Sequence, residues 1–250
     1  PSLLRLKAAH FPLGKAADNF GPRQKYLSDF PAESLSEIIK NFHNTIWRYE
    51  NEFIPAVQAD KADRAVNCGE EIKFVMHRRE DCKKLVELID KGELPLRVTH
   101  NDTKLNNVLF DSDSDDAICV IDLDTVMPGL ALYDFGDSIR FGANSCAEDD
   151  DNYDKVELML DYFEAYAKGF LSEAGDALNQ CEIDNLAFSA KLMTFECGMR
   201  FLTDYLNGDT YFKTAYPEHN LVRAKNQFAL VADMERKMEQ MQQIIKNITE

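Results

Sequence analysis

The segment Thr99–Asp124 of this 250-residue chain reads THNDTKLNNVLFDSDSDDAICVIDLD and contains a compact set of chemically capable side chains. It holds a His-x-Asp triplet at His100 and Asp102, then Asn107 five residues after that Asp, and an apolar run that ends in Asp122. These residues supply one base and two hard oxygen ligands within a short stretch. We therefore expect the rest of the chain to be organised around this segment.

Two short apolar runs, at 107–110 and 117–121, flank an acidic turn at 111–116. Short apolar runs on either side of a tight polar turn predict a β-hairpin. The turn lacks the Gly and the terminal Glu of an EF-hand loop, so we interpret it as turn chemistry and not as a calcium site. A hairpin of this length would bring the two Asp side chains and the Asn side chain to one end of a small sheet.

This set of side chains suits phosphoryl transfer. An Asp carboxylate and an Asn side-chain oxygen are good ligands for Mg²⁺, which keeps several waters and takes few protein ligands. The remaining Asp is then free to accept a proton. Phosphoryl transfer requires this division of roles, with metal to neutralise phosphate charge and one carboxylate to orient a hydroxyl nucleophile.

Most of the remaining chain has the hydrophobic spacing of helices. This spacing predicts helices at 33–56, 70–90, 153–172, 184–206 and 219–248, and a turn leading into a helix at 128–146. Pro55 is expected to end the first helix, and Gly92 is expected to cap the second. The predicted fold class is therefore α+β and mostly helical, with one small β-hairpin.

The overall charge excludes two classes of partner. The net charge of −16 gives the chain no general affinity for nucleic acid or for an anionic membrane surface. No apolar run approaches the ~20 residues that a membrane-spanning helix needs. The six cysteines are scattered without a CxxC pair, which is typical of unpaired thiols in a reducing compartment. The expected location is the cytoplasm.

The segment resembles the catalytic segment of the aminoglycoside phosphotransferase and choline kinase branch of the protein-kinase-like fold. That family carries H-x-D-x-x-x-x-N, an apolar strand and then Ile-Asp, and here these are His100, Asp102, Asn107 and Ile121-Asp122. The resemblance implies that Asp102 is the catalytic base and that His100 braces the loop by hydrogen bonding. It also implies that Asn107 and Asp122 hold the Mg²⁺ that is bound to the phosphates of ATP.

Within this family, four stretches look closest to N-acetylhexosamine 1-kinases. They are FHNTIWRY, IDLDTVMPGLALYDFGD, ECGMRFLTDYLNGDTYF and HNLVRAKNQF. The resemblance implies a small sugar substrate that is phosphorylated at its anomeric hydroxyl, N-acetylglucosamine or N-acetylgalactosamine. It assigns Arg200, Tyr211 and Phe141 to substrate binding. In the second stretch, Asp134 and Asp137 lie where the family has an Asp that stabilises the catalytic loop.

The helical spacing independently makes Arg200 unusual. The predicted helix 184–206 is apolar on two sides, so we expect it to be largely buried, and Arg200 lies on one of its apolar stripes. A buried Arg needs a partner or a ligand. The alternative to a ligand is an ion pair within the helix, with Glu196 or Asp204. For Tyr211, the alternative is a loop aromatic side chain that packs on the core.

A kinase of this fold also needs an amino-terminal lobe, with a β-sheet and a Lys that pairs with the nucleotide phosphates. Nothing before residue 95 predicts such a sheet. We therefore expect residues 33–250 to form a protein-kinase-like carboxy-terminal lobe, and residues 1–32 to be an irregular lead-in or lobe linker. The expected partner is the protein's own amino-terminal lobe, absent from this chain, so that the chain alone would be weakly active or inactive.

Two other functions compete with this interpretation. Asp122 and Asp124 match the D-x-D motif of haloacid-dehalogenase phosphatases, in which the first Asp is phosphorylated and the second acts as acid and base. That fold needs repeated strand–helix units afterwards, whereas the chain after Asp122 is mostly helical in pattern. The other alternative is a non-catalytic sugar-binding lobe, against which the intact base and metal ligands argue.

Overall fold

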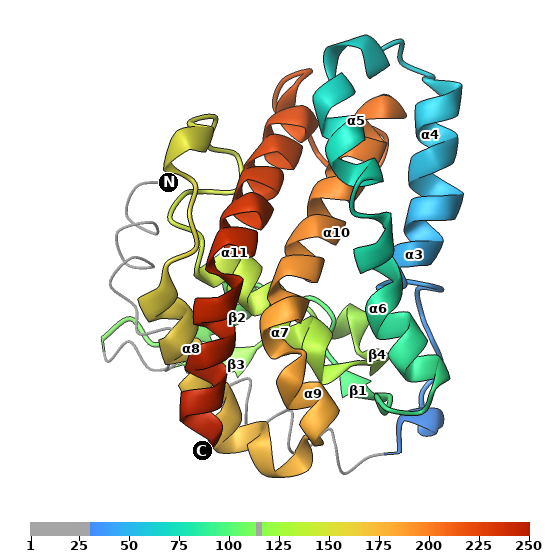
Figure 1. Ribbon diagram of the computed structural model, residues 1–250. Helices are drawn as coiled ribbons and strands as arrows, with labels where there is room; N and C mark the ends of the chain where they lie inside the picture. The colour runs from blue at the N-terminus through green and yellow to red at the C-terminus, as the bar shows by residue number, and fades with distance from the viewer. Residues whose placement is uncertain (1–30, 114–116) are drawn as a thin grey trace.

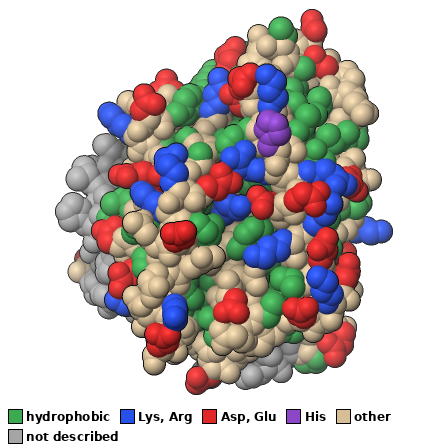
Figure 2. Space-filling model, viewed as in Figure 1, with side chains coloured by type: hydrophobic (Ala, Val, Ile, Leu, Met, Phe, Trp, Pro, Cys, Tyr) green, Lys and Arg blue, Asp and Glu red, His purple; other side chains and the backbone are tan. Residues whose placement is uncertain are grey.

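The computed structural model describes residues 31–113 and 117–250. The predicted lead-in at 1–32, except for its last two residues, and half of the predicted acidic turn lie outside the described residues. None of the helices in the described part combines the length and the apolar character needed to cross a bilayer. On the face seen in Figure 2, acidic and basic side chains are interspersed among the described residues and do not separate by sign.

Helices make up the body of the molecule. The long helices α10 (Leu186–Leu206) and α11 (His219–Thr249) run side by side through its middle (Figure 1). α7 (Ala131–Gly142) packs along α10, and α8 (Leu160–Ala174) packs against α11. Together with two small antiparallel sheets, these helices confirm the predicted α+β, mostly helical fold.

The first predicted helix, 33–56, starts later than predicted. A 3-10 turn at Ala32–Ser34 is followed by irregular turns, and the helix begins only at α3 (Thr45–Arg48). The reason is local capping, because the side chain of Asn44 accepts a hydrogen bond from the backbone N of Trp47 at 3.0 Å. The apolar residues before this cap had the right spacing for a helix, but they lie in turns.

Pro55 does not end this helix, contrary to the prediction. The chain continues through a wider π-helical turn at Tyr49–Phe53 into α4 (Ile54–Ala59). Proline has no N–H to donate, and it is tolerated here because it lies in the first turn of α4, directly after the π-helical turn. The helix ends at Asp60, whose φ of 36° lies in the left-handed region.

The second predicted helix is divided in two. α5 (Gly69–Met76) and α6 (Arg79–Asp90) are separated by a break at which Arg78 turns toward α11. There its guanidinium binds both carboxylate oxygens of Glu235, at 2.7 and 3.0 Å. The predicted cap is confirmed, because Gly92 has a φ of 73°, which a residue with a side chain rarely adopts.

The carboxy-terminal half agrees more closely with the sequence prediction. α10 and α11 lie where they were expected, and a short helix, α9 (Gln180–Asp184), precedes α10. α8 begins at Leu160 and not at 153, because Tyr153–Lys155 forms a separate 3-10 turn. These helices are long and strongly patterned, which is where hydrophobic periodicity is most reliable.

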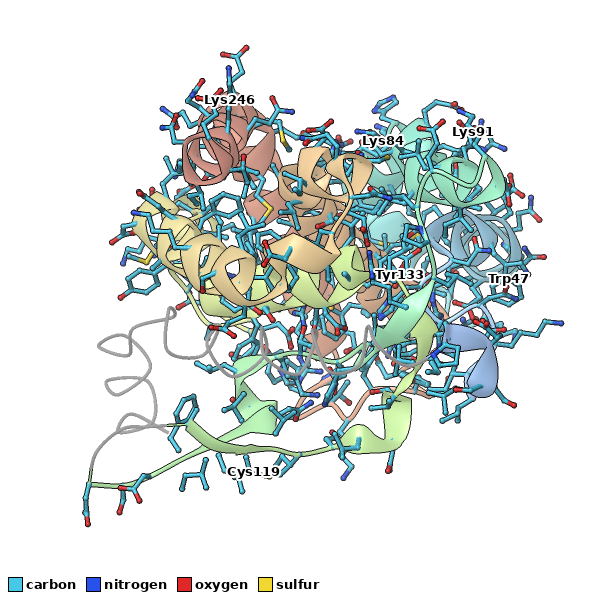
Figure 3. All side chains as sticks on the ribbon, turned by 90° about the horizontal axis from the view of Figure 1, so that it is seen from below. Trp47, Lys84, Lys91, Cys119, Tyr133 and Lys246 are labelled. Carbon is cyan, nitrogen blue, oxygen red and sulfur yellow. The ribbon has the colours of Figure 1, made fainter. Side chains whose placement is uncertain are left out.

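The two sheets are nested. The inner pair, β2 (Val108–Phe110) and β3 (Ala117–Val120), is antiparallel and confirms the predicted hairpin. The outer pair, β1 (Arg97–Thr99) and β4 (Met127–Gly129), was not predicted, because strands of three residues that include Pro and Gly show no alternating pattern. We call residues 97–129 the double hairpin. Figure 3 shows its inner part, where Cys119 is labelled, projecting from the helical body.

The double hairpin rests on a tightly packed helical core. The ring of Phe135 in α7 lies at the centre of one aromatic cluster, with the rings of Phe163 and Phe170 at centroid distances of 5.9 and 5.2 Å. Next to it, Gly136 allows α7 to approach α10 closely, since a Cβ at this position would lie 2.5 Å from the backbone oxygen of Ser189. This contact fixes the position of α7 directly behind the double hairpin.

Candidate active site

The double hairpin brings the predicted base and metal ligands to one end of the inner sheet. Asn107 ends the 3-10 turn Leu105–Asn107, and its carbonyl oxygen accepts a hydrogen bond from the backbone N of Ile121 at 2.9 Å. Its side-chain Nδ2 donates to the carbonyl oxygen and to Oδ2 of Asp102, at 2.8 and 2.9 Å. Asp122 follows Ile121 directly, so it lies beside the same junction.

Lys104 is a site residue that the sequence analysis missed. Its Nζ lies 2.8 Å from Oδ2 of Asp102, and both side chains are partly exposed. Among the described residues, the side chains that bind the Asp102 carboxylate both contact Oδ2, and none contacts Oδ1. The signal that could have revealed Lys104 is its position, because a lysine side chain two residues from Asp102 in a short loop can reach that carboxylate.

His100 is buried and connects two peptides. Its Nδ1 accepts a hydrogen bond from the backbone N of Asp102 at 3.2 Å, and its Nε2 lies 3.1 Å from the carbonyl oxygen of Ile121. Because a backbone N–H donates to Nδ1 and a carbonyl accepts from Nε2, the ring carries its proton on Nε2. His100 therefore links the peptide that precedes Asp102 with the peptide that precedes Asp122.

Asp134, in the first turn of α7, binds the backbone of the same loop. Its carboxylate accepts hydrogen bonds from the backbone N of His100 at 2.9 Å and from that of Asn101 at 2.7 Å. Burial raises the pKa of Asp134 to about 6, although the two backbone donors lower it. Asn101 has a φ of 64°, so these bonds stabilise a left-handed conformation that a non-glycine residue seldom adopts.

Asp122 has a left-handed backbone as well, with a φ of 62°, and its side chain is exposed. No protein side chain among the described residues pairs with its carboxylate. This exposed carboxylate and the side-chain oxygen of Asn107, whose backbone carbonyl accepts a hydrogen bond from Ile121, together make the sparse, hard donor set that Mg²⁺ accepts when substrate phosphates and water complete its coordination. The residues present therefore fit a magnesium site, although the described residues contain no cluster of three or more acidic, His or Cys ligands.

The side chain of Arg200 lies among aromatic rings. Its guanidinium carbon is 5.2 Å from the ring centroid of Phe42, 5.6 Å from that of Phe212 and 5.8 Å from that of Tyr211. Arg200 and Cys197 are the two residues of α10 that are not buried. Arg200 is therefore not fully buried, contrary to the expectation from its apolar stripe, and its guanidinium lies beside the ring of Tyr211, which the resemblance also assigned to substrate binding.

The intrahelical ion pair that we considered as an alternative for Arg200 is not formed. Asp204 instead accepts hydrogen bonds from the backbone N of Tyr211 and of Phe212, each at 2.9 Å, and so anchors the loop after α10. Glu196 is bound by His43 and Thr45. Within the part of the chain that the structure describes, no carboxylate pairs with Arg200.

Phe141, the third residue assigned to substrate binding, lies in the last turn of α7 and is half-buried. No ring contact joins it to Tyr211 or Arg200 among the described residues. Its neighbour Arg140 is buried and pairs with Asp137 and Glu148, at 2.8 and 2.6 Å. Of the three residues assigned to substrate binding, the structure thus brings Arg200 and Tyr211 together and leaves Phe141 on the adjoining helix.

Comparison with known proteins shows a family and a similar fold. A family model described as phosphotransferase enzyme family matches residues 32–169, which is more than half of the chain. Among solved structures, an ethanolamine kinase of Plasmodium vivax superposes with a TM-score of 0.53 at 15% sequence identity. The match covers 86% of this chain but 59% of that kinase, and it shows a protein-kinase-like fold. On the family match, the chain belongs to the phosphotransferase enzyme family.

Proposed function

We propose that the protein carrying this chain is a kinase that transfers the γ-phosphate of ATP to a hydroxyl group of a small sugar. The observation that carries the proposal is the arrangement around Asp102. One oxygen of its carboxylate is held by Asn107 and Lys104, while no described residue occupies the other. A carboxylate held in this way can accept a proton from a hydroxyl nucleophile in a fixed direction.

The neighbouring residues would divide the remaining work. Lys104 places a positive charge beside the base, where the transferred phosphoryl group would have to pass. Asn107 and Asp122 would hold Mg²⁺, which neutralises charge on the nucleotide phosphates when bound. His100 keeps the peptides before Asp102 and Asp122 at a fixed separation, because one ring contacts both. Asp134 and His100 are therefore support, and Asp102 is the base.

The surroundings of Arg200 support a neutral, hydroxyl-rich acceptor. The guanidinium of Arg200 forms no ion pair with a described carboxylate, so its N–H groups can donate hydrogen bonds to sugar hydroxyls or to an amide carbonyl, and its positive charge disfavours a cationic amine. The side chain of Tyr211 is 68% exposed beside it, so its ring is available to stack on an apolar sugar face. An N-acetylhexosamine phosphorylated at its anomeric hydroxyl combines these features, and the proposed substrates are N-acetylglucosamine and N-acetylgalactosamine.

The test is a Mg·ATP phosphotransfer assay on the full-length protein, with both N-acetylhexosamines, ethanolamine and choline as acceptors. We expect turnover of the sugars and little turnover of the amines. In Arg200→Met, KM for the sugar should rise while KM for ATP stays unchanged. Arg236→Met is the matched control, because Arg236 is exposed on α11 and pairs with Asp233 there.

Two outcomes decide between the parts of the proposal. Turnover of the amines but not of the sugars would overturn the acceptor class and leave the kinase reaction standing. Failure to phosphorylate any hydroxyl acceptor, with binding of the sugar measured by calorimetry in the absence of Mg·ATP, would instead favour the non-catalytic binding lobe.

A further inference from the structure

The peptide group that joins Asn101 to Asp102 is held on both sides by histidines. Its N–H donates to Nδ1 of His100 at 3.2 Å. Its carbonyl oxygen lies 3.0 Å from Nε2 of His43, a residue that comes 58 positions earlier and belongs to the turn before α3. The orientation of this peptide plane determines the direction in which the side chain of Asp102 leaves the backbone.

His43 is itself held by α10. Its Nδ1 lies 2.7 Å from Oε1 of Glu196, and the second oxygen of that carboxylate accepts a hydrogen bond from Thr45 at 2.5 Å. His43 is 8% exposed and Glu196 is 1% exposed, so water does not compete for these bonds. Burial alone would raise the pKa of Glu196, but the charge and hydrogen bond of His43, with two nearby arginines, lower it to about 2.

Each ring nitrogen of His43 faces one oxygen atom. One is the ionised carboxylate of Glu196, and the other is the backbone carbonyl of Asn101. The carbonyl can only accept, so Nε2 donates to it, while Nδ1 is held by the carboxylate group of Glu196. Hydrogen bonds to charged groups are shorter and stronger than neutral ones, which makes this a firm connection between α10 and the loop.

We propose that His43 and Glu196 act as a positioning pair, which fixes the peptide before Asp102 and thereby aims the catalytic base. The consequence for catalysis rests on the proposed kinase function. The structural part does not, because the bonds exist whatever reaction the loop performs.

The position of the pair also ties the base to the proposed acceptor site. Glu196 lies one turn before Arg200 on α10, and the ring of Phe42 lies between the two regions. That ring is 4.4 Å from the ring of His43 and 5.2 Å from the guanidinium carbon of Arg200, measured to centroids. A continuous path of contacts therefore runs from Arg200 through Phe42 and His43 to Asn101.

The test uses three variants and a matched control in the full-length protein. His43→Phe keeps a ring but removes both hydrogen bonds, His43→Gln keeps one donor for the Asn101 carbonyl, and Glu196→Gln removes the charge with little change in shape. His77→Phe is the control, because His77 is exposed at the end of α5. Each protein is assayed for kcat and KM, and exchange of the Asp102 amide hydrogen is followed by NMR.

For His43→Phe we expect kcat to fall about 10²-fold, which is the cost of displacing a reacting group by roughly 1 Å, while KM for ATP is unchanged. The Asp102 amide should exchange faster, and His43→Gln should recover part of kcat. A purely structural role would lower thermal stability without this split between kcat and KM and without the partial rescue.

The two hypotheses fail in different ways. If wild-type protein and His43→Phe have equal kcat and equal exchange of the Asp102 amide, the positioning pair is overturned. If no variant, wild type included, transfers phosphate, but the amide is deprotected in His43→Phe and not in His77→Phe, the pair stands and the proposed kinase function fails. Should His43→Phe not fold, His43→Gln and Glu196→Gln give the same comparison.

Discussion

The double hairpin and the helix α10 use polar residues in opposite ways. α10 is buried along its whole length except at Cys197 and Arg200, and its carboxylates have fixed partners, as Glu196 has in His43. The double hairpin is thin and partly exposed, and its acidic residues Asp102 and Asp122 have oxygens that no described protein group occupies. The buried carboxylates hold structure, and the exposed ones are available for chemistry.

The difference explains how a segment with little core of its own can keep an unusual shape. Strands of three or four residues and two left-handed residues, Asn101 and Asp122, are not stable by themselves. Their conformations are set from the helices, directly by Asp134 and indirectly by Glu196 through His43. Buried positions should therefore affect mainly stability, and the exposed carboxylates of the double hairpin should affect mainly rate.

The largest expected effect is on rate and comes from the double hairpin. Asp102→Asn should lower kcat by about 10²- to 10⁴-fold, the usual contribution of a general base. The free energy of unfolding should change by no more than about 1 kcal/mol, because the pair with Lys104 is partly exposed. Kinetics and urea denaturation of the same protein measure both quantities.

Asp124→Asn is the matched control for this substitution. Asp124 is exposed in the 3-10 turn Leu123–Thr125, and the kinase mechanism does not use it. The kinase activity of Asp124→Asn should equal that of wild type. A hydrolase that employed Asp122 and Asp124 would instead lose its activity in this variant, so the control also separates the kinase from the haloacid-dehalogenase alternative.

The next effect concerns stability and depends on pH. The folded-state pKa of Glu196 is lowered to about 2 from 4.5, so its contribution to stability is present above pH 4.5 and is lost as the pH falls toward 2. Glu196→Gln should be less stable than wild type by about 3 kcal/mol at pH 7, from the pKa difference. The difference should narrow as the pH drops below about 4.5, which denaturant titrations at several pH values would measure. A difference that stays constant with pH would show that Glu196 is not held as a carboxylate.

A smaller stability effect tests the packing of the helices alone. Gly136→Ala should destabilise the fold by roughly 1–3 kcal/mol, because the new Cβ would meet the backbone of Ser189 and α7 would have to move. Gly69→Ala is the control, since nothing lies within 4 Å of the corresponding Cβ at the start of α5. It should be neutral or slightly stabilising, and thermal unfolding would compare the two variants.

The sequence predicted those features that depend on local pattern. The inner hairpin follows from two short apolar runs on either side of a polar turn, and α10 and α11 follow from helical spacing. The same hairpin pattern predicted that Asp102, Asn107 and Asp122 lie at one end of a small sheet. The outer strands could not be found, because Val98 pairs with Pro128 across 30 positions and neither run alternates.

The residues that support the site were hidden for a related reason. The partners of His43 lie 58 and 153 positions away and belong to other elements. Lys104 was overlooked although it is local, since a lysine in an exposed loop usually has no partner. Contacts over long sequence separations are set by tertiary packing, which hydrophobic periodicity does not report.

The smallest expected effect lies on the outer face of the inner hairpin. The side chain of Leu109 is 48% exposed opposite Cys119, so Leu109→Ser should change the free energy of unfolding by less than about 0.5 kcal/mol. Val120 lies on the other face of the same hairpin, packed with Val108 and 4% exposed. Val120→Ala should therefore cost about 1–2 kcal/mol for the buried methyl groups that it removes. An equal loss of unfolding free energy in the two variants would mean that both faces of the hairpin are covered. The hairpin would then belong to a buried interface and not to an exposed active-site face.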